Sequence, residues 1–575
     1  MKYAFWVSAV LTLGVGCKSH NNIAKLTSKR DTTAIADIKP KELPKLKSVT
    51  VFYVQPTEVL ASNQIVPPRA CSAELASHIQ DDLQLLYTER KSEPLWIDSK
   101  GLKPTLLELK AQVETASLHG LDPESYGLSE INRLIAKIGD EHNSPEDLAL
   151  YDMTLSFYYL LYNYHLVNGR FNPDRLNGIW FLDKKNIDLP TELAKVNGRG
   201  SLSRYFKKLT PEDDRYIRLI NYLTFYKTIA KKGGWPYIDE TDFETIEPGD
   251  KHPRVADIRK RLTVTDPMKT KKDANPEEYD IFLEEAVKKF QMRHGLEADG
   301  RIGKGTLAAM NIPVEEKIRL IELNLERHRW LPHRFADDYL LVNIPDYKLT
   351  AYKNAKPRLT MKVIVGKEYT STPIFSDTLK YLVFSPTWTV PKSIKVKEML
   401  PRLQRNPYSY GRSYKFYRGV SNDPANEVNP GYVDWTKYSA NYFPFNIVQQ
   451  PGPYNALGLV KFIMPNNFNI YLHDTPTDYL FDRTDRAFSH GCIRLEQPAE
   501  LAKYLLQDQK DWDDERINEH MLKDSPVYVH FTNDYQVQIA YLTAFVDDAG
   551  IMNFRKDVYG HDKAQFDAID KMASR

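Results

Sequence analysis

The spacing of apolar residues changes near Trp330, and this change most limits the folds open to the chain. From Ala73 to Lys232, apolar residues recur every three or four positions, which indicates amphipathic helices. Beyond Trp330 this helical spacing ends, and short apolar runs such as Tyr339 to Ile344 are typical of strands. At 575 residues the chain is also long enough for several cores. We therefore predict a multidomain α+β protein with a helical first half and a β-rich second half.

The helical part is predicted to form one domain over residues 51–246. Ser144 as N-cap and Pro145 at the first helical position open its longest helix. Trp180 falls in an expected loop and is interpreted as a packing residue. No group of residues in this part points to chemistry, so no site is assigned to it.

Residues 247–313 are predicted to form a compact bundle of three helices. The first helix carries Val255 and Leu262, and the second carries Leu283. A glycine-rich turn follows, and the third helix begins after Gly303.

The β-rich part divides into a domain over residues 330–531 and a C-terminal extension over residues 532–575. Within it, a Pro-, Tyr- and Asn-rich insertion at about 395–445 is too long for an ordinary connection. Such insertions are usually lids or substrate-binding loops.

The N-terminus has the pattern of an export signal over residues 1–17. Lys2 precedes an apolar run from Tyr3 to Val15, and Gly16-Cys17 follows. This pattern resembles a bacterial lipoprotein processing site, at which Cys17 becomes lipidated; a plain secretory peptide is the alternative. Polar residues 18–50 are expected to be a flexible tether.

Only Cys71 and Cys492 remain when Cys17 is set aside, which excludes a disulfide scaffold in an exported protein. Either these two pair, or one is kept as a free thiol. Net charge is +2, and the basic residues are dispersed, so nothing favours nucleic-acid binding.

The strongest chemical signal is the segment Ser489-His490-Gly491-Cys492-Ile493-Arg494-Leu495, which follows His473 at the end of a predicted strand. A thiolate attacks carbonyls, and a histidine within hydrogen-bond reach supplies it at neutral pH. Gly491 lets the backbone approach a substrate, where successive N–H groups can form an oxyanion hole. Zinc binding is the alternative for two histidines and a cysteine, but paired ligand motifs and a fourth ligand are missing from the sequence.

This segment resembles the signature of the L,D-transpeptidase catalytic domain of YkuD type. The segments "IVGKEYTSTPIFSD", "LVFSPTWTVPKSI" and "IYLHDTP" agree with the large periplasmic members. The bundle sequence "AVKKFQMRHGLEADGRIGKGTL" resembles a three-helix peptidoglycan-binding domain. Together these likenesses extend from about Ala73 to Gly560.

The resemblance implies that Cys492 attacks the carbonyl between meso-diaminopimelate and the terminal D-alanine of a tetrapeptide stem. His473 would be the base, oriented by the carbonyl of Asp474, and His490 an auxiliary polar group. The thioester would pass to the amine of a second diaminopimelate, giving a three-to-three cross-link.

The substrate side of the site is expected to include Ser489, Arg494, Tyr471 and Trp388. Arg494 would bind a stem carboxylate, with a structural ion pair as the alternative. Tyr471 and Trp388 would line the groove, and packing in a core is the alternative for both.

The resemblance further implies a periplasmic lipoprotein held at the outer membrane, acting in wall remodelling and cell shape without cofactor or metal. Its expected partners are peptidoglycan stem peptides and cell-wall synthesis enzymes, and carbapenems are expected to acylate Cys492. Alternatives are an L,D-carboxypeptidase that uses the same thioester, an inactive wall-binding scaffold, and a general cysteine peptidase.

Overall fold

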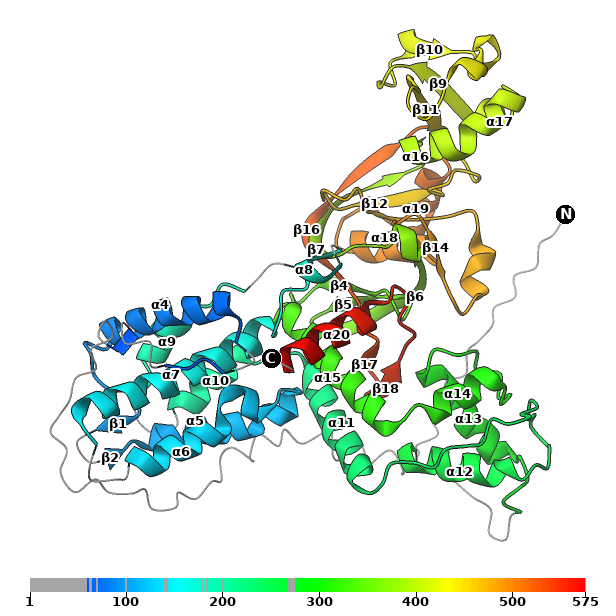
Figure 1. Ribbon diagram of the computed structural model, residues 1–575. Coiled ribbons are helices and arrows are strands. Elements are labelled where there is room, and N and C mark those ends of the chain that lie inside the picture. Colours follow the sequence, from blue (N-terminus) through cyan, green and yellow to red (C-terminus); the bar gives the residue numbers. More distant parts are fainter. Residues whose placement is uncertain are drawn as a thin grey trace.

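The computed structural model confirms the multidomain α+β architecture (Figure 1). The predicted signal peptide over residues 1–17, Cys17 and the tether over residues 18–50 lie outside the described residues. The structure describes residues 59–60, 65–68, 71–98, 101–138, 143–177, 179–182, 185–197, 201–266, 268 and 275–573.

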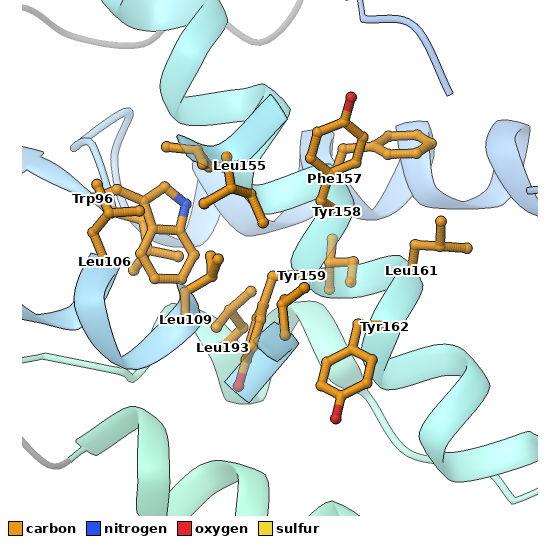
Figure 2. Packing of buried hydrophobic residues seen from close by; sticks show 14 of the residues in the cluster. Trp96, Leu106, Leu109, Leu155, Phe157, Tyr158, Tyr159, Leu161, Tyr162 and Leu193 are labelled. Atoms are coloured by element: carbon orange, nitrogen blue, oxygen red, sulfur yellow. The ribbon is translucent and has the colours of Figure 1, made fainter. Parts of the chain in front are cut away.

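The N-terminal helical unit is built around α7 (Pro145–Asn168), which is buried along almost its whole length. Its start is fixed by a capping box in which Ser144 and Asp147 satisfy each other's backbone N–H groups. Figure 2 shows side chains of this helix, such as Tyr159, packed with Trp96 and other buried residues. The surrounding elements are α4 (Ala73–Glu89), α5 (Pro104–Glu114), α6 (Leu128–Ile138), α9 (Leu189–Ala194), α10 (Ser201–Leu209) and the hairpin of β1 (Ile97–Asp98) and β2 (Gly101–Leu102).

A second helical layer connects this unit to the rest of the molecule. Helix α11 (Asp214–Lys231) packs on α15 (Val314–Trp330), and both contact the hairpin of β17 (Ala544–Val546) and β18 (Met552–Phe554). The predicted helical domain therefore contains a helix, α11, whose core is shared with the C-terminal part of the chain.

The small bundle has the three helices that the sequence predicts. They are α12 (Arg254–Thr265), α13 (Ile281–Arg293) and α14 (Lys304–Asn311), and Gly303 is the N-cap of the last. Their buried apolar residues, which include Val255, Leu262 and Leu283, are those that set the helical period.

The β-rich domain is a ten-stranded sheet with the order β12-β13-β15-β6-β5-β4-β16-β7-β3, in which β14 pairs with β6. An additional pairing of β12 with β7 closes the sheet on itself. Helices α18 (Pro498–Leu506) and α19 (Asp514–Met521) pack on this sheet. The strands are β3 (Trp180–Phe181), β4 (Tyr339–Asn343), β5 (Lys348–Lys353), β6 (Lys356–Gly366), β7 (Ile374–Phe384), β12 (Val460–Ile463), β13 (Leu472–His473), β14 (Ala487–Ser489), β15 (Ile493–Leu495) and β16 (Val527–Ala540).

Two strands of this sheet cross the limits expected from the sequence. Strand β16 continues past Phe531 to Ala540 and pairs in parallel with β4, so part of the expected C-terminal extension belongs to the sheet. A register shift between His530 and Tyr535 interrupts its alternation. Strand β3 comes from the helical half and pairs with β7, which places Trp180 in a strand and not in a loop.

The insertion forms a separate four-stranded sheet at the far end of the molecule in Figure 1. Its order is β10-β9-β11-β8, so it extends from Trp388 to Gln449, beyond the expected 395–445. Trp435 lies at the centre of its own core. Its elements are β8 (Trp388–Thr389), α16 (Lys392–Ile394), the π-helical turn η4 (Lys395–Met399), α17 (Leu400–Arg405), β9 (Tyr414–Arg418), β10 (Glu427–Val428) and β11 (Phe445–Gln449).

Helix α20 (His561–Ala573) is the last described element and packs against α15 through an ion pair of Arg327 with Asp562 at 2.7 Å. Within the described part of the chain, no helix has the length and apolar character needed to cross a membrane.

Candidate active site

The pairing of β13 with β15 brings the residues of the cysteine motif together. The two strands are parallel, and Leu472 lies opposite Ile493 while His473 lies opposite Arg494. Leu472 and Ile493 point into the core. Since side chains alternate along a strand, His473 and Arg494 face the other side of the sheet. Cys492 directly precedes β15 and packs partly against the core.

The turn before Cys492 is held by hydrogen bonds within the motif itself. The Ser489 hydroxyl donates to the Cys492 carbonyl at 2.6 Å and accepts from the Gly491 N–H at 3.1 Å. Gly491 has φ +118°, and a Cβ there would lie 3.2 Å from Ile470. Ser489 is buried, so its hydroxyl shapes the turn instead of facing a ligand as the sequence predicts.

Cys492 is a half-buried free thiol, and so is Cys71, so the two cysteines do not pair. The Cys492 Sγ contacts the Asn469 carbonyl at 3.6 Å. Burial raises the pKa of the Cys492 thiol, while hydrogen bonding to Tyr471 and the charge of Arg494 oppose that rise. The thiol therefore needs a base to ionise near neutral pH.

His473 has the form that a base requires. Its Nδ1 donates to the Asp474 carbonyl at 2.5 Å, which leaves Nε2 as the acceptor nitrogen. Burial, with the nearby charge of Arg494, lowers the pKa of His473 to about 3, so the ring is neutral at physiological pH. The Asp474 carboxylate accepts from the N–H groups of Leu459 and Thr475, both at 2.7 Å, which fixes the segment that orients the ring.

Two cations flank this face. Arg494 donates to the Thr477 hydroxyl at 3.1 Å, and its Nε is buried without a hydrogen-bond partner among the described residues. Lys461 lies opposite His473 in the next strand, with its Nζ 6.0 Å from the centre of the Tyr471 ring. Burial lowers the pKa of Lys461. The site is thus positively charged and suited to an anionic group.

Three segments of the chain match known protein families. Residues 337–529 match the family described as "L,D-transpeptidase catalytic domain" (YkuD). Residues 81–223 match "Scaffold domain", and residues 251–310 match "Putative peptidoglycan binding domain".

Residues 337–529 are an L,D-transpeptidase catalytic domain of the YkuD family.

The chain is also 32% identical over 257 residues to a protein named "Putative L,D-transpeptidase" from Haemophilus influenzae. The match covers 44% of this chain and 51% of that protein, so it spans about half the length of this relative. The crystal structure of the L,D-transpeptidase (residues 123–326) from Xylanimonas cellulosilytica matches at 13% identity, with a TM-score of 0.16, over 52% of this chain and 100% of that one.

The remaining predicted residues of the L,D-transpeptidase domain are Tyr471, His490 and Trp388. The Tyr471 ring is 5.7 Å from that of His473, and Tyr471 hydrogen-bonds with Cys492. The side chain of His490 is half exposed and faces the insertion, with its Nε2 3.7 Å from a Glu398 oxygen. Trp388 is partly buried and packs on the separate core of the four-stranded sheet, and its role in the groove stays a prediction.

The sequence did not single out Asn469, Lys461 or Thr477 as members of the site. Asn469 has φ +56°, and its carbonyl faces the thiol. Each of the three belongs to a segment that only sheet pairing brings to Cys492. No local sequence motif points to these residues. Thr477 is close in sequence to a predicted site residue, since it lies four positions after His473.

Proposed function

We propose that the protein is a peptidoglycan L,D-transpeptidase with Cys492 as nucleophile and His473 as base. The observation that carries this proposal is the parallel register of β13 and β15, in which His473 and Arg494 are paired and Cys492 precedes the pair. The neutral His473, with Nδ1 bound to a carbonyl, supports the role of a base. The YkuD match supports the reaction class.

In the first half-reaction, His473 Nε2 takes the proton of the Cys492 thiol. The sulfur attacks the carbonyl carbon that joins meso-diaminopimelate to the terminal D-alanine of a tetrapeptide stem. The C–N bond breaks, D-alanine leaves with the proton from His473, and a thioester remains on Cys492.

In the second half-reaction, the side-chain amine of another diaminopimelate attacks the thioester carbon. His473 takes a proton from this amine and returns it to the sulfur as the C–S bond breaks. The product is a three-to-three cross-link. Water in place of the amine gives a tripeptide, which is the L,D-carboxypeptidase outcome.

The charges of the site support an anionic stem peptide as substrate. Arg494 has a hydroxyl as its partner rather than a carboxylate, and one of its buried donors is unused among the described residues. A bidentate contact with a stem carboxylate would satisfy that donor.

We also propose that the protein works in the periplasm. The apolar run before Gly16-Cys17 supports export and lipidation of Cys17, which would anchor the chain at the outer membrane. The peptidoglycan-binding match over residues 251–310 supports attachment to the wall, where cell-wall synthesis enzymes would be its neighbours. We expect carbapenems to acylate Cys492.

The test is mass spectrometry of disaccharide-tetrapeptide incubated with the purified protein and with Cys492→Ala. Cys71→Ala is the matched control, because Cys71 is also half-buried and free. Three-to-three dimers that need Cys492 and persist in Cys71→Ala support the transpeptidase. Tripeptide alone supports the carboxypeptidase, and no product from the unmutated protein contradicts both.

A further inference from the structure

The C-terminal segment packs against the catalytic sheet next to the turn that precedes Cys492. Tyr559 is buried, and its hydroxyl donates to the Gly366 carbonyl at 2.8 Å and accepts from the Thr372 N–H at 3.2 Å. Gly366 ends β6, and Thr372 precedes β7. One hydroxyl thus joins both ends of the connection between these strands.

Residues of that connection hydrogen-bond to the backbone of the cysteine turn, residues 489–492. The fully buried Thr372 hydroxyl donates to the Gly491 carbonyl at 2.7 Å and accepts from the Gly366 N–H at 2.9 Å. The Thr370 hydroxyl donates to the Ser489 carbonyl at 3.0 Å. The carbonyls on both sides of His490 are therefore fixed by residues 366–372.

Tyr559 is itself held in place. Its N–H donates to the Tyr541 hydroxyl at 2.8 Å, and that hydroxyl donates to Asp557 at 2.5 Å. The rings of Tyr541 and Tyr559 stack with centroids 5.6 Å apart. The Tyr559 hydroxyl consequently has little freedom to follow a movement of the turn.

The hydrogen bond from the Thr372 hydroxyl to the Gly491 carbonyl also sets the direction of the next backbone N–H, that of Cys492. A trans peptide is planar, and its C=O and N–H point in opposite directions. No cis peptide bond occurs in the described residues, so fixing the Gly491 carbonyl also fixes the Cys492 N–H. In the proposed reaction, an N–H at this position binds the oxyanion that forms when the thiolate attacks.

We propose that Tyr559 is a positioning residue that acts through Thr372 to orient the Cys492 N–H as an oxyanion donor. This inference rests on the proposed function. It gives the C-terminal segment a part in the reaction, although that segment lies outside the family match over residues 337–529.

The test compares two reactions of Cys492. Acylation by p-nitrophenyl acetate passes through an oxyanion, whereas alkylation by iodoacetamide needs the thiolate but no oxyanion donor. Both are followed at Cys492 by peptide mass spectrometry. We expect Tyr559→Phe to slow acylation by about tenfold and to leave alkylation unchanged, because the donor is misdirected rather than removed.

Tyr535→Phe is the matched control. Tyr535 is buried in the same core, and its hydroxyl donates to the Leu505 carbonyl at 3.2 Å, away from the cysteine turn. We expect a comparable fall in Tm and no change in either reaction. Equal slowing of both reactions in Tyr559→Phe, or equal slowing of acylation in Tyr535→Phe, would overturn the proposal.

If Tyr559→Phe does not fold, Thr372 provides the same test. Thr372→Val removes the hydroxyl and is expected to slow acylation alone, whereas Thr372→Ser keeps the hydroxyl and is expected to restore it. Acylation at the unmutated rate in Thr372→Val overturns the proposal. Should the unmutated protein react with p-nitrophenyl acetate but not with disaccharide-tetrapeptide, the proposed function fails and the positioning role is still decided. Failure of both acyl reactions in the unmutated protein overturns both.

Discussion

His473 is buried beneath the sheet surface, with its Nδ1 bound to the Asp474 carbonyl, whereas His490 has a half-exposed side chain beside Glu398. Burial lowers the pKa of His473 to about 3. His473 is therefore already neutral across the range from pH 5 to 8 in which an ordinary histidine changes its charge. The thiol, whose pKa is raised, is the group that titrates as the pH increases.

His473→Ala should lower the rate of Cys492 acylation by about 10²- to 10⁴-fold at pH 7, the usual contribution of a general base. Higher pH should restore part of the loss, because hydroxide then generates the thiolate. His490→Ala is the control and should lower the rate by less than about tenfold. The measurement is the acylation rate against pH for the three proteins. A break near pH 6.5 in the unmutated protein would contradict a His473 that is already neutral.

Gly458 lies against the carboxylate that fixes the His473 segment. It has φ +61°, and a Cβ there would lie 2.2 Å from the Asp474 Cγ. Gly458→Ala should displace Asp474, lower Tm by several degrees and slow acylation. Gly419→Ala is the control, since Gly419 has φ +92° and nothing within 4 Å of the added Cβ. Both variants strain the backbone, so equal acylation rates in the two would show that Asp474 does not orient the base.

At the scale of elements, the helices were predictable because their signals are local. Ser144 and Pro145 mark the start of α7, and Gly303 marks the start of α14. Strand limits were less predictable, because pairing decides them. The sequence prediction ended the domain at Phe531, where the alternation of β16 is interrupted before it continues to Ala540.

The same reasoning applies to the site. The motif predicts Cys492 and His473 as nucleophile and base, since a cysteine, a glycine and two histidines at this spacing are a chemical signature. Lys461 was not predicted, because it becomes a neighbour of His473 only through the pairing of β12 with β13. Trp388 was expected in the groove with core packing as the alternative, and its strand β8 belongs to the sheet of the insertion. Sequence patterns therefore indicate candidate reactive residues, whereas the pairing of strands decides which residues become neighbours.

The insertion has its own core, so damage there should remain local. Trp435 is buried at its centre, and Trp435→Ala should destabilise the four-stranded sheet by about 3–5 kcal/mol. Hydrogen exchange should increase over residues 414–449 and stay unchanged in β4 and β6. Tyr432→Ala, at a side chain that is 90% exposed, is the control and should change neither region. Faster exchange throughout the catalytic sheet would contradict independent stability of the insertion.

At the scale of the whole molecule, buried histidines link stability to pH. Burial lowers the pKa of His119 and His165 to about 3, and that of His328, His333 and His561 to about 4. Below the ordinary value near 6.5, the unfolded chain takes up protons that the folded chain does not bind. Each such group therefore removes up to about 1.4 kcal/mol of stability for every pH unit below 6.5, until its folded pKa is reached.

We expect Tm to fall markedly between pH 7.5 and pH 5. His165→Gln should make this fall smaller, because one buried histidine is removed, whereas His530→Gln, at an exposed position, should leave it unchanged. Calorimetric Tm values against pH provide the measurement. A Tm that is constant across this range would mean that the buried histidines take up protons in the folded state.

Strand β16 lies between β4 and β7, pairing with both, and β3 from the helical half pairs with β7 on its other side. Synthesis runs from the N-terminus, so β3, β4 and β7 all leave the ribosome before the strand that joins them. Until Ala540 has emerged, β4 and β7 each present an open edge rich in apolar residues, which favours pairing with other chains. A nascent chain stopped before β16 can therefore still form the pairing β7-β12-β13-β15-β6-β5-β4, which includes the strands next to Cys492, and β16 closes the gap that remains between β4 and β7.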